Sequence, residues 1–226
     1  MIDKNIIPCV IGSTGLVGSH LIENLSNIYP QVISITRKEV NYSKSAVKNI
    51  VIDFDNIENE KIFNPDNHLY IALGTTRKKA GSDQNFIKVD YDYCLEIAKN
   101  AVENGVKRIS IISSVGSNPN SSLLYPRTKG LIERDLGKLP LEHISVMKPG
   151  LILGDRKESR FTEKAAKHLF SLVNPLLIGG LQKYKSIQAN DISKAMIYQN
   201  SKGNNGFQSL EFIQLMESAK NLDLLD

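Results

Sequence analysis

The sequence has only two cysteines, and it has neither a long apolar run nor a large excess of charge of one sign. Cys9 lies in an apolar run and Cys94 in a predicted helix, which argues against a disulfide framework and for a reducing compartment. Apolar runs such as residues 109–112 are far shorter than the roughly 20 residues of a transmembrane helix, so no membrane span is expected. With a net charge of +4 and dispersed basic residues, we expect no nucleic-acid partner.

The start of the chain also lacks the features of a targeting segment. Residues 1–5 are polar and include an acidic residue, unlike a signal peptide or a basic amphipathic transit peptide. We therefore expect a cytoplasmic protein. The 226 residues are 41% hydrophobic and 23% charged, which is typical of an ordinary globular chain and compatible with a single domain.

Short apolar runs alternate with helical patterns through the first two-thirds of the chain. This order predicts an α/β fold with a doubly wound parallel sheet, the Rossmann fold, because near-continuous apolar strands are buried on both faces. After residue 150 the pattern loosens, with predicted helices at 163–173 and 191–200. We expect a single domain of residues 1–226, in which residues 151–226 contribute a small substrate-side cap. The predicted strands are 6–11, 32–36, 49–53, 68–73, 107–113 and 144–147, and the predicted earlier helices are 16–25, 82–104 and 125–139.

A glycine-rich turn follows the first predicted strand and opens the first predicted helix. Gly12 allows the chain to reverse, Gly15 lets a pyrophosphate approach the backbone, and Gly18 lets the helix pack closely on the strand. The first amides of the helix would bind the phosphates. This context favours an NAD(P)-binding site over a turn that only reverses the chain. The predicted site comprises Gly12, Ser13, Thr14, Gly15, Leu16, Val17 and Gly18.

Two basic residues, Arg37 and Lys38, follow the second predicted strand, where an acidic residue would bind the ribose 2′-hydroxyl of NAD. Because a guanidinium can pair with a 2′-phosphate through two hydrogen bonds, we expect NADP(H) rather than NAD(H). An ordinary solvated strand end is the alternative interpretation of this pair. The fold suggests further cofactor contacts from Asp53, at the adenine, and from Ala72, Leu73 and Gly74, along the cofactor.

Tyr125 and Lys129 are four residues apart, so their side chains share one face of a predicted helix. They follow a strand that ends in Ser113 and Ser114, which brings the hydroxyl groups to the carboxyl edge of the sheet. We expect hydride transfer between the nicotinamide and a small carbonyl compound or alcohol, with Tyr125 moving the proton. Lys129 would favour the phenolate and bind the nicotinamide ribose, while Ser114 would hold the substrate oxygen. Ser113 takes that role if the strand ends one residue earlier, and an exposed tyrosine beside a solvated lysine is the alternative.

Six blocks of the sequence form a recognisable set: residues 73–81, 89–93, 113–116, 125–130, 148–151 and 154–160. Together they resemble the Tat-interacting oxidoreductase family, a group of atypical short-chain dehydrogenases whose animal members carry regulatory roles as well as bound NADPH. The resemblance runs from Gly12 to Met196, and residues 75–81 are a specific part of it. It implies the same catalytic and cofactor roles as those given above. Lys148 stands where an arginine is more usual before Pro-Gly.

The sequence therefore predicts a cytoplasmic NADP(H)-dependent oxidoreductase that reduces a small carbonyl substrate. The alternative is an NADPH-binding regulatory or sensor protein with little or no turnover, and the complete serine, tyrosine and lysine set favours the enzyme. No metal site is expected, because the four histidines show no ligand spacing with cysteines or acids. Either a monomer or a homodimer is compatible with the sequence.

Overall fold

The computed structural model describes residues 2–154 and 177–224, and a parallel sheet of seven strands forms its centre. The strand order is β3-β2-β1-β4-β5-β6-β9, so the chain builds one half of the sheet outward from β1 and then returns to build the other half. Every neighbouring pair is parallel, which confirms the doubly wound Rossmann-type arrangement. The strands are β1 (Ile7–Ile11), β2 (Val32–Thr36), β3 (Val47–Val51), β4 (Asn67–Ile71), β5 (Arg108–Ile112), β6 (His143–Met147) and β9 (Gly206–Leu210).

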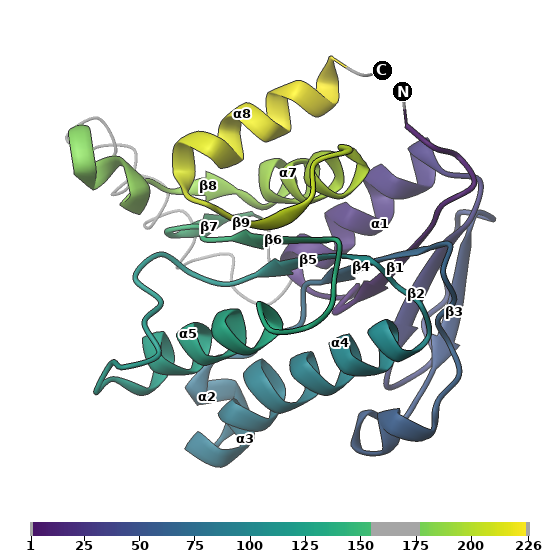
Figure 1. The fold of residues 1–226 in the computed structure, drawn as a ribbon, viewed down its shortest axis with the longest axis horizontal. Helices are drawn as coiled ribbons and strands as arrows, with labels where there is room; N and C mark the ends of the chain where they lie inside the picture. Colours follow the sequence, from purple (N-terminus) through teal and green to yellow (C-terminus); the bar gives the residue numbers. More distant parts are fainter. Residues whose placement is uncertain (1, 155–176, 225–226) are drawn as a thin grey trace.

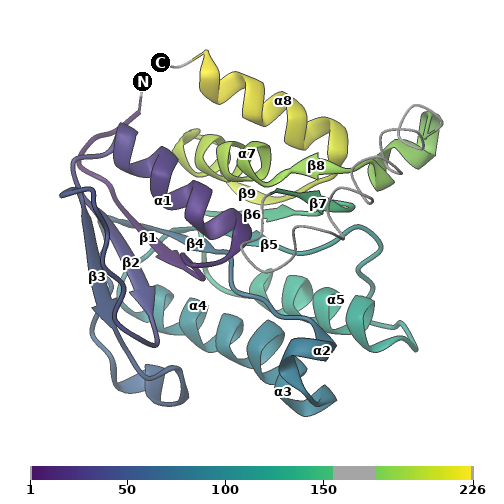
Figure 2. The same ribbon diagram turned by 180° about the vertical axis from the view of Figure 1, so that it is seen from behind.

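Helices cover both faces of this sheet (Figure 1). One face is covered by α1, α7 and α8, and the other by α3, α4 and α5; the view from behind shows the same two layers (Figure 2). Within the described ranges, no helix is both long and apolar enough to span a membrane. The helices are α1 (Leu16–Ile28), α2 (Arg77–Ala80), α3 (Asp83–Ile87), α4 (Tyr93–Glu103), α5 (Leu124–Leu136), α7 (Ala189–Ser201) and α8 (Phe212–Asp223), with 3₁₀ helices η1 (Phe54–Asn59) and η4 (Gly179–Tyr184) and the π-helical turn η2 (Lys88–Asp92).

The sheet separates two hydrophobic cores. Successive side chains of a strand point to opposite faces, so on β1 Cys9 and Ile11 belong to the core beneath α4, while Val10 belongs to the core beneath α1 and α7. Cys9 and Cys94 are both buried and free, as the sequence predicted. Burial on both faces explains why the strands read as nearly continuous apolar runs.

The C-terminal part of the chain adds elements that the sequence analysis did not predict. β9 forms an edge strand beside β6, and α8 packs on α7. The β9 sequence, GFQSL, contains no β-branched residue, so its strand signal is weak. A second, two-stranded parallel sheet joins β7 (Ile152–Leu153) to β8 (Ile187–Gln188). The predicted helix at 163–173 lies outside the described residues.

Candidate functional site

The glycine-rich turn forms a tight backbone cradle between β1 and α1. Gly12 has a φ of +78°, and a Cβ at this position would lie 2.5 Å from the carbonyl oxygen of Ala72. A Cβ on Gly18 would lie 2.0 Å from the carbonyl oxygen of Gly12. A side chain at either position would therefore displace the backbone. Gly15, the N-cap residue of α1, is exposed, so the cradle is open at the start of this helix.

Ser13 fixes the turn to the second strand and to the loop that follows it. Its hydroxyl accepts hydrogen bonds from the hydroxyl of Ser34 on β2, at 2.8 Å, and from that of Tyr42, at 3.1 Å. Because Tyr42 belongs to the connection between β2 and β3, this connection is held against the glycine turn. Of the other predicted turn residues, Thr14 is exposed, Leu16 is half-buried and Val17 is buried in the core beneath α1.

Arg37 and Lys38 directly follow β2, and both side chains are exposed. The backbone around them is ordered by Asn49 on β3. The Asn49 side chain donates to the hydroxyl of Thr36 and accepts from the backbone amide of Val40, both at 2.9 Å. The Thr36 hydroxyl in turn donates to the carbonyl of Lys38 at 2.7 Å. The two basic side chains therefore project from a backbone that side-chain hydrogen bonds hold in place.

Asp53 follows β3, which ends two residues earlier than predicted. Its carboxylate caps η1 by accepting hydrogen bonds from the amide of Asp55, at 3.0 Å, and from the side chain of Asn56, at 2.7 Å. Asp53 is exposed beside the end of β3. The observed role of its carboxylate is to start η1.

The residues after β4 lie between the glycine turn and the helical layer. β4 also ends two residues earlier than predicted, so Ala72, Leu73 and Gly74 form a loop instead of a strand end. The Ala72 carbonyl abuts Gly12, and a Cβ on Gly74 would lie 3.3 Å from a carboxylate oxygen of Asp90. This loop therefore connects the predicted cofactor cradle to the helices on the other side.

α5 carries Tyr125 and Lys129 one turn apart, on a helix that begins one residue before the predicted start. Lys129 is only 5% exposed, and its Nζ lies 2.7 Å from Oδ1 of Asp90. Burial alone would lower the pKa of Lys129, but Asp90, Tyr125 and Cys94 outweigh it, so the pKa is raised. Tyr125 is 44% exposed, and its ring lies beside that of Phe86, with centroids 5.9 Å apart. The tyrosine is accessible to a ligand, while the lysine is enclosed.

The two serines after β5 have different surroundings, although both are buried. The Ser113 hydroxyl donates to the Glu133 carboxylate, which also pairs with Nζ of Lys148 at 3.1 Å. Within the described part of the chain, the Ser114 hydroxyl has no hydrogen-bond partner. Ser114 therefore fits the predicted substrate contact better than Ser113, whose hydroxyl is already bound. Lys148, which stands where an arginine is more usual before Pro-Gly, pairs with Glu133 through its single ammonium group.

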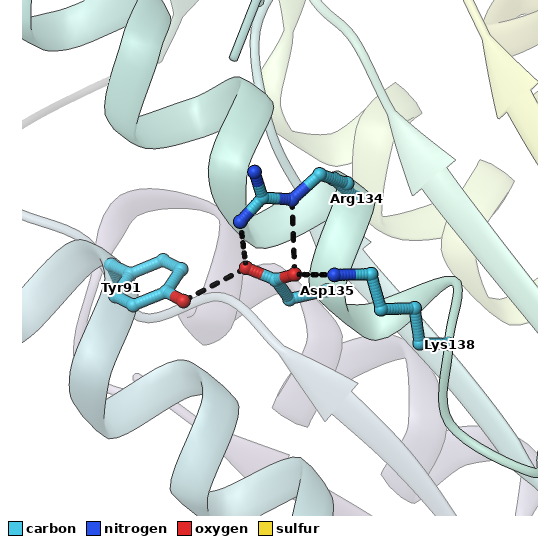
Figure 3. Close-up of polar contacts among 4 residues, drawn as sticks. All are labelled: Tyr91, Arg134, Asp135 and Lys138. Atoms are coloured by element: carbon cyan, nitrogen blue, oxygen red, sulfur yellow. Dashed lines mark hydrogen bonds and ion pairs between the residues drawn. The ribbon is translucent and has the colours of Figure 1, made fainter.

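A second contact joins η2 to α5 (Figure 3). The Tyr91 hydroxyl donates to the carboxylate of Asp135 at 2.8 Å, and Arg134 and Lys138 bind the same carboxylate at 2.8 and 2.6 Å. Hydrogen bonds from Arg134, and then from Lys138 and Tyr91, hold the pKa of Asp135 well below its usual range. With the Asp90–Lys129 pair, this contact fixes η2 against α5 at two points.

Asp90 is a site residue that the sequence analysis did not assign. In the continuous helix predicted over 82–104, the four-residue spacing of Val89 and Tyr93 predicts a shared apolar face. Both residues are only half-buried, whereas Asp90 is 1% exposed. The wider π-helical turn η2 rotates the following residues relative to a regular helix. The available signal was an acidic residue next to the predicted apolar stripe, which by itself also fits a solvated position.

The arrangement combines groups that could bind an anion with groups that could transfer a proton. An open cradle of backbone amides lies at the end of β1, and on the same edge of the sheet are the Ser114 hydroxyl, which follows β5 and has no partner among the described residues, and the buried ammonium of Lys129 on α5. Ligands of open α/β sheets bind at this edge. Among the described residues, no group of three or more His, Cys, Asp or Glu side chains could hold a metal ion.

Comparisons with known proteins identify relatives of this chain. The HIM1 family matches residues 18–178. "Protein FMP52, mitochondrial" of Candida albicans is 35% identical over 206 residues, which cover 87% of this chain and 89% of that protein. "Protein HTATIP2" of Rattus norvegicus is 35% identical over 167 residues, which cover 71% and 69%.

Solved structures with the same fold include nucleotide-sugar enzymes. The UDP-N-acetylglucosamine 4-epimerase of Methanobrevibacter ruminantium has a TM-score of 0.67 and 19% identity, covering 93% of this chain and 77% of that chain. MoeE5 in complex with UDP-glucuronic acid and NAD has a TM-score of 0.65 and 16% identity, covering 90% and 75%. At this level of identity, the similarity establishes a shared Rossmann-like fold.

Proposed function

This chain belongs to the HIM1 family, with the FMP52 and HTATIP2 proteins among its relatives, and we propose that it is an NADP(H)-dependent oxidoreductase acting on a small carbonyl compound. The family assignment agrees with the predicted resemblance to the Tat-interacting group of atypical short-chain dehydrogenases. One observation carries the proposal: a buried, paired Lys129 lies on the same sheet edge as the open glycine cradle, together with a Ser114 hydroxyl that has no partner in the part of the chain that the structure describes.

The residues present fit a phosphorylated dinucleotide. The cradle leaves no room for a side chain at Gly12 or Gly18, and it is open at Gly15, where the first amides of α1 would hold the pyrophosphate. Arg37 and Lys38 would hold the 2′-phosphate, because both are cations at the strand end where NAD sites carry an acid. Asp53 would face the adenine, and residues 72–74 would lie along the cofactor. The bound cofactor supplies the hydride.

The catalytic roles follow from the exposure of each group. The Ser114 hydroxyl would donate a hydrogen bond to the carbonyl oxygen of the substrate and orient it. The half-exposed Tyr125 would give its hydroxyl proton to that oxygen as the carbonyl carbon is reduced, leaving a phenolate. The Lys129 ammonium would stabilise this phenolate from one turn further along α5.

The test separates cofactor binding from turnover. Purified protein should bind NADPH more tightly than NADH, measured by calorimetric titration, and should oxidise NADPH with at least one member of a panel of aldehydes, ketones and quinones. Tyr125→Phe should lower kcat by about 1,000-fold, because the proton donor is lost. NADPH affinity should stay within about twofold, since the phenylalanine ring retains the contact with Phe86.

Tyr198→Phe is the matched control, because Tyr198 and Lys202 form a second pair with the same spacing. This variant should keep full turnover. Equal affinity for NADH would overturn the 2′-phosphate assignment, and full turnover by Tyr125→Phe would overturn the assignment of the proton donor. Tight NADPH binding without consumption by any carbonyl compound would favour the regulatory alternative.

The location and assembly of the protein belong to the same proposal. We keep the cytoplasmic location predicted from the sequence, although the names of several fungal relatives place them in mitochondria. Cell fractionation distinguishes the two compartments. Light scattering in solution distinguishes a monomer from a homodimer.

A further inference from the structure

A buried carboxylate, Asp90, connects two parts of the proposed site that come from different elements. Its Oδ1 lies 2.7 Å from Nζ of Lys129 on α5, and its Oδ2 accepts the backbone amide of Thr75, after β4, at 2.7 Å. The same carboxylate abuts Gly74. One side chain therefore contacts both the proposed cofactor loop and the lysine of the proposed catalytic set.

The use of both oxygens explains why an amide would not replace this carboxylate. Thr75 offers an N–H donor and Lys129 an ammonium, so both positions require an acceptor. An asparagine has one acceptor oxygen and one NH₂ group, and the NH₂ would face a donor at one of the two positions. Leaving a buried donor unpaired is costly, and more so when the donor is charged.

The charge balance around Lys129 also depends on Asp90. The titratable groups that face the ammonium are Asp90 on η2, Tyr125 on its own helix and Cys94 on α4. Burial raises the pKa of the Cys94 thiol to about 12, so this thiol is neutral at physiological pH. A buried ammonium without a counter-ion tends to lose its proton. The carboxylate thus provides the negative charge that keeps Lys129 protonated.

The position of Asp90 is fixed by anchors on both sides within η2. Lys88 pairs with Asp55 of η1 at 2.7 Å, and the Tyr91 hydroxyl donates to Asp135 of α5 at 2.8 Å. The turn is therefore attached to the segment after β3 and to α5 at the same time. A carboxylate carried by such a turn can hold a defined orientation.

We infer that Asp90 is a positioning residue that keeps Lys129 protonated and directed toward Tyr125, and that links Lys129 to the loop after β4. The inference rests on the proposed function for the catalytic role of Lys129. The coupling between Asp90 and Lys129 can nevertheless be measured in the unliganded protein.

The test is a pH titration of the Lys129 side chain by NMR, with the signal assigned through Lys129→Arg. In the unmodified chain, Lys129 should keep its proton beyond the ordinary lysine midpoint of about 10.4. In Asp90→Asn, the midpoint should fall by about 2 pH units, since the buried ammonium loses its counter-ion. With NADPH and a substrate from the panel, kcat of this variant should fall by about 100-fold, with a much smaller change in KM.

Asp92→Asn is the matched control, because Asp92 is an exposed acid on the same turn. It should leave both the Lys129 midpoint and kcat unchanged. An unchanged midpoint in Asp90→Asn would overturn the inference. A midpoint below the ordinary lysine value in the unmodified chain would also overturn it, and this measurement does not depend on the folding of a variant. Absence of turnover in the unmodified chain, with the predicted shift in the midpoint, would count against the proposed function while supporting the coupling.

Discussion

The amino ends and the carboxyl ends of the parallel strands form two opposite borders of the sheet, here called the amino edge and the carboxyl edge. Both carry buried polar side chains, but the interactions of these side chains differ. At the amino edge, His68, Arg108 and His143 lie in register on β4, β5 and β6, and the Arg108 guanidinium donates to the carbonyl of Asn200 on α7 at 2.8 Å. At the carboxyl edge, the Ser114 hydroxyl has no partner in the described part of the chain. At the amino edge Arg108 attaches α7, while both ring nitrogens of His143 lack a hydrogen-bond partner among the described residues. At the carboxyl edge, the proposed function supplies a ligand as the partner of the Ser114 hydroxyl.

The largest expected effect tests the cradle at the carboxyl edge. Gly18→Ala would place a Cβ 2.0 Å from the Gly12 carbonyl oxygen, so α1 must move away from the turn. We expect a loss of about 3 kcal/mol in the free energy of unfolding, measured in urea, and weaker binding of NADPH. Gly203→Ala is the control, because a Cβ there meets no atom within 4 Å and should change stability little. Unchanged stability of Gly18→Ala would show that the cradle is not rigid.

Much of the fold could be predicted, because burial on both faces leaves a clear pattern in the sequence. The observed β2, Val32–Thr36, coincides with its predicted range, and Gly12 and Gly18 lie where the turn required them. β9 was missed, since its sequence has no β-branched residue and it lies at the edge of the sheet. An edge strand contacts only one neighbouring strand, so fewer of its residues are constrained to be apolar.

Less of the site could be predicted, because it depends on contacts between distant residues. The spacing of Tyr125 and Lys129 is visible in the sequence, but the pairing of Lys129 with Asp90 spans 39 positions and requires the π-helical turn. Similarly, adjacent serines are equivalent in the sequence. Their difference arises because Glu133 lies within reach of Ser113, and the sequence gives no indication of that proximity.

The next effect tests the amino edge through its pH dependence. Burial, and then the positive charge of Arg108, lowers the pKa of His143 to about 4. An unfolded histidine has a pKa of about 6.5, so below that pH the unfolded state binds a proton that the native state does not. Stability should therefore fall as the pH drops from 6.5 toward 4. The contribution of His143 should be about 2 kcal/mol between pH 7 and pH 5, measured by urea unfolding.

His143→Phe should remove that part of the pH dependence, because the ring no longer titrates. Ile144→Val is the control for destabilisation alone: it lies next to His143 in the same strand, and its cost should be the same at both pH values. An identical pH dependence in His143→Phe and the unmodified chain would show that the amino edge tolerates a charged histidine. The two edges would then differ less than their contacts suggest.

The smallest effect concerns the helical layer between the two edges. Tyr91→Phe removes the hydrogen bond to Asp135 but leaves the Asp90–Lys129 pair intact, so η2 loses one of the two polar contacts with α5 described above. We expect a loss of about 1 kcal/mol in the free energy of unfolding and no change in the Lys129 titration. Tyr93→Phe, which removes a bond to the exposed carboxylate of Asp55, should cost less. A shifted Lys129 midpoint in Tyr91→Phe would mean that the orientation of Asp90 depends on this anchor, and that the carboxyl edge is supported from the helical layer as well as from the sheet.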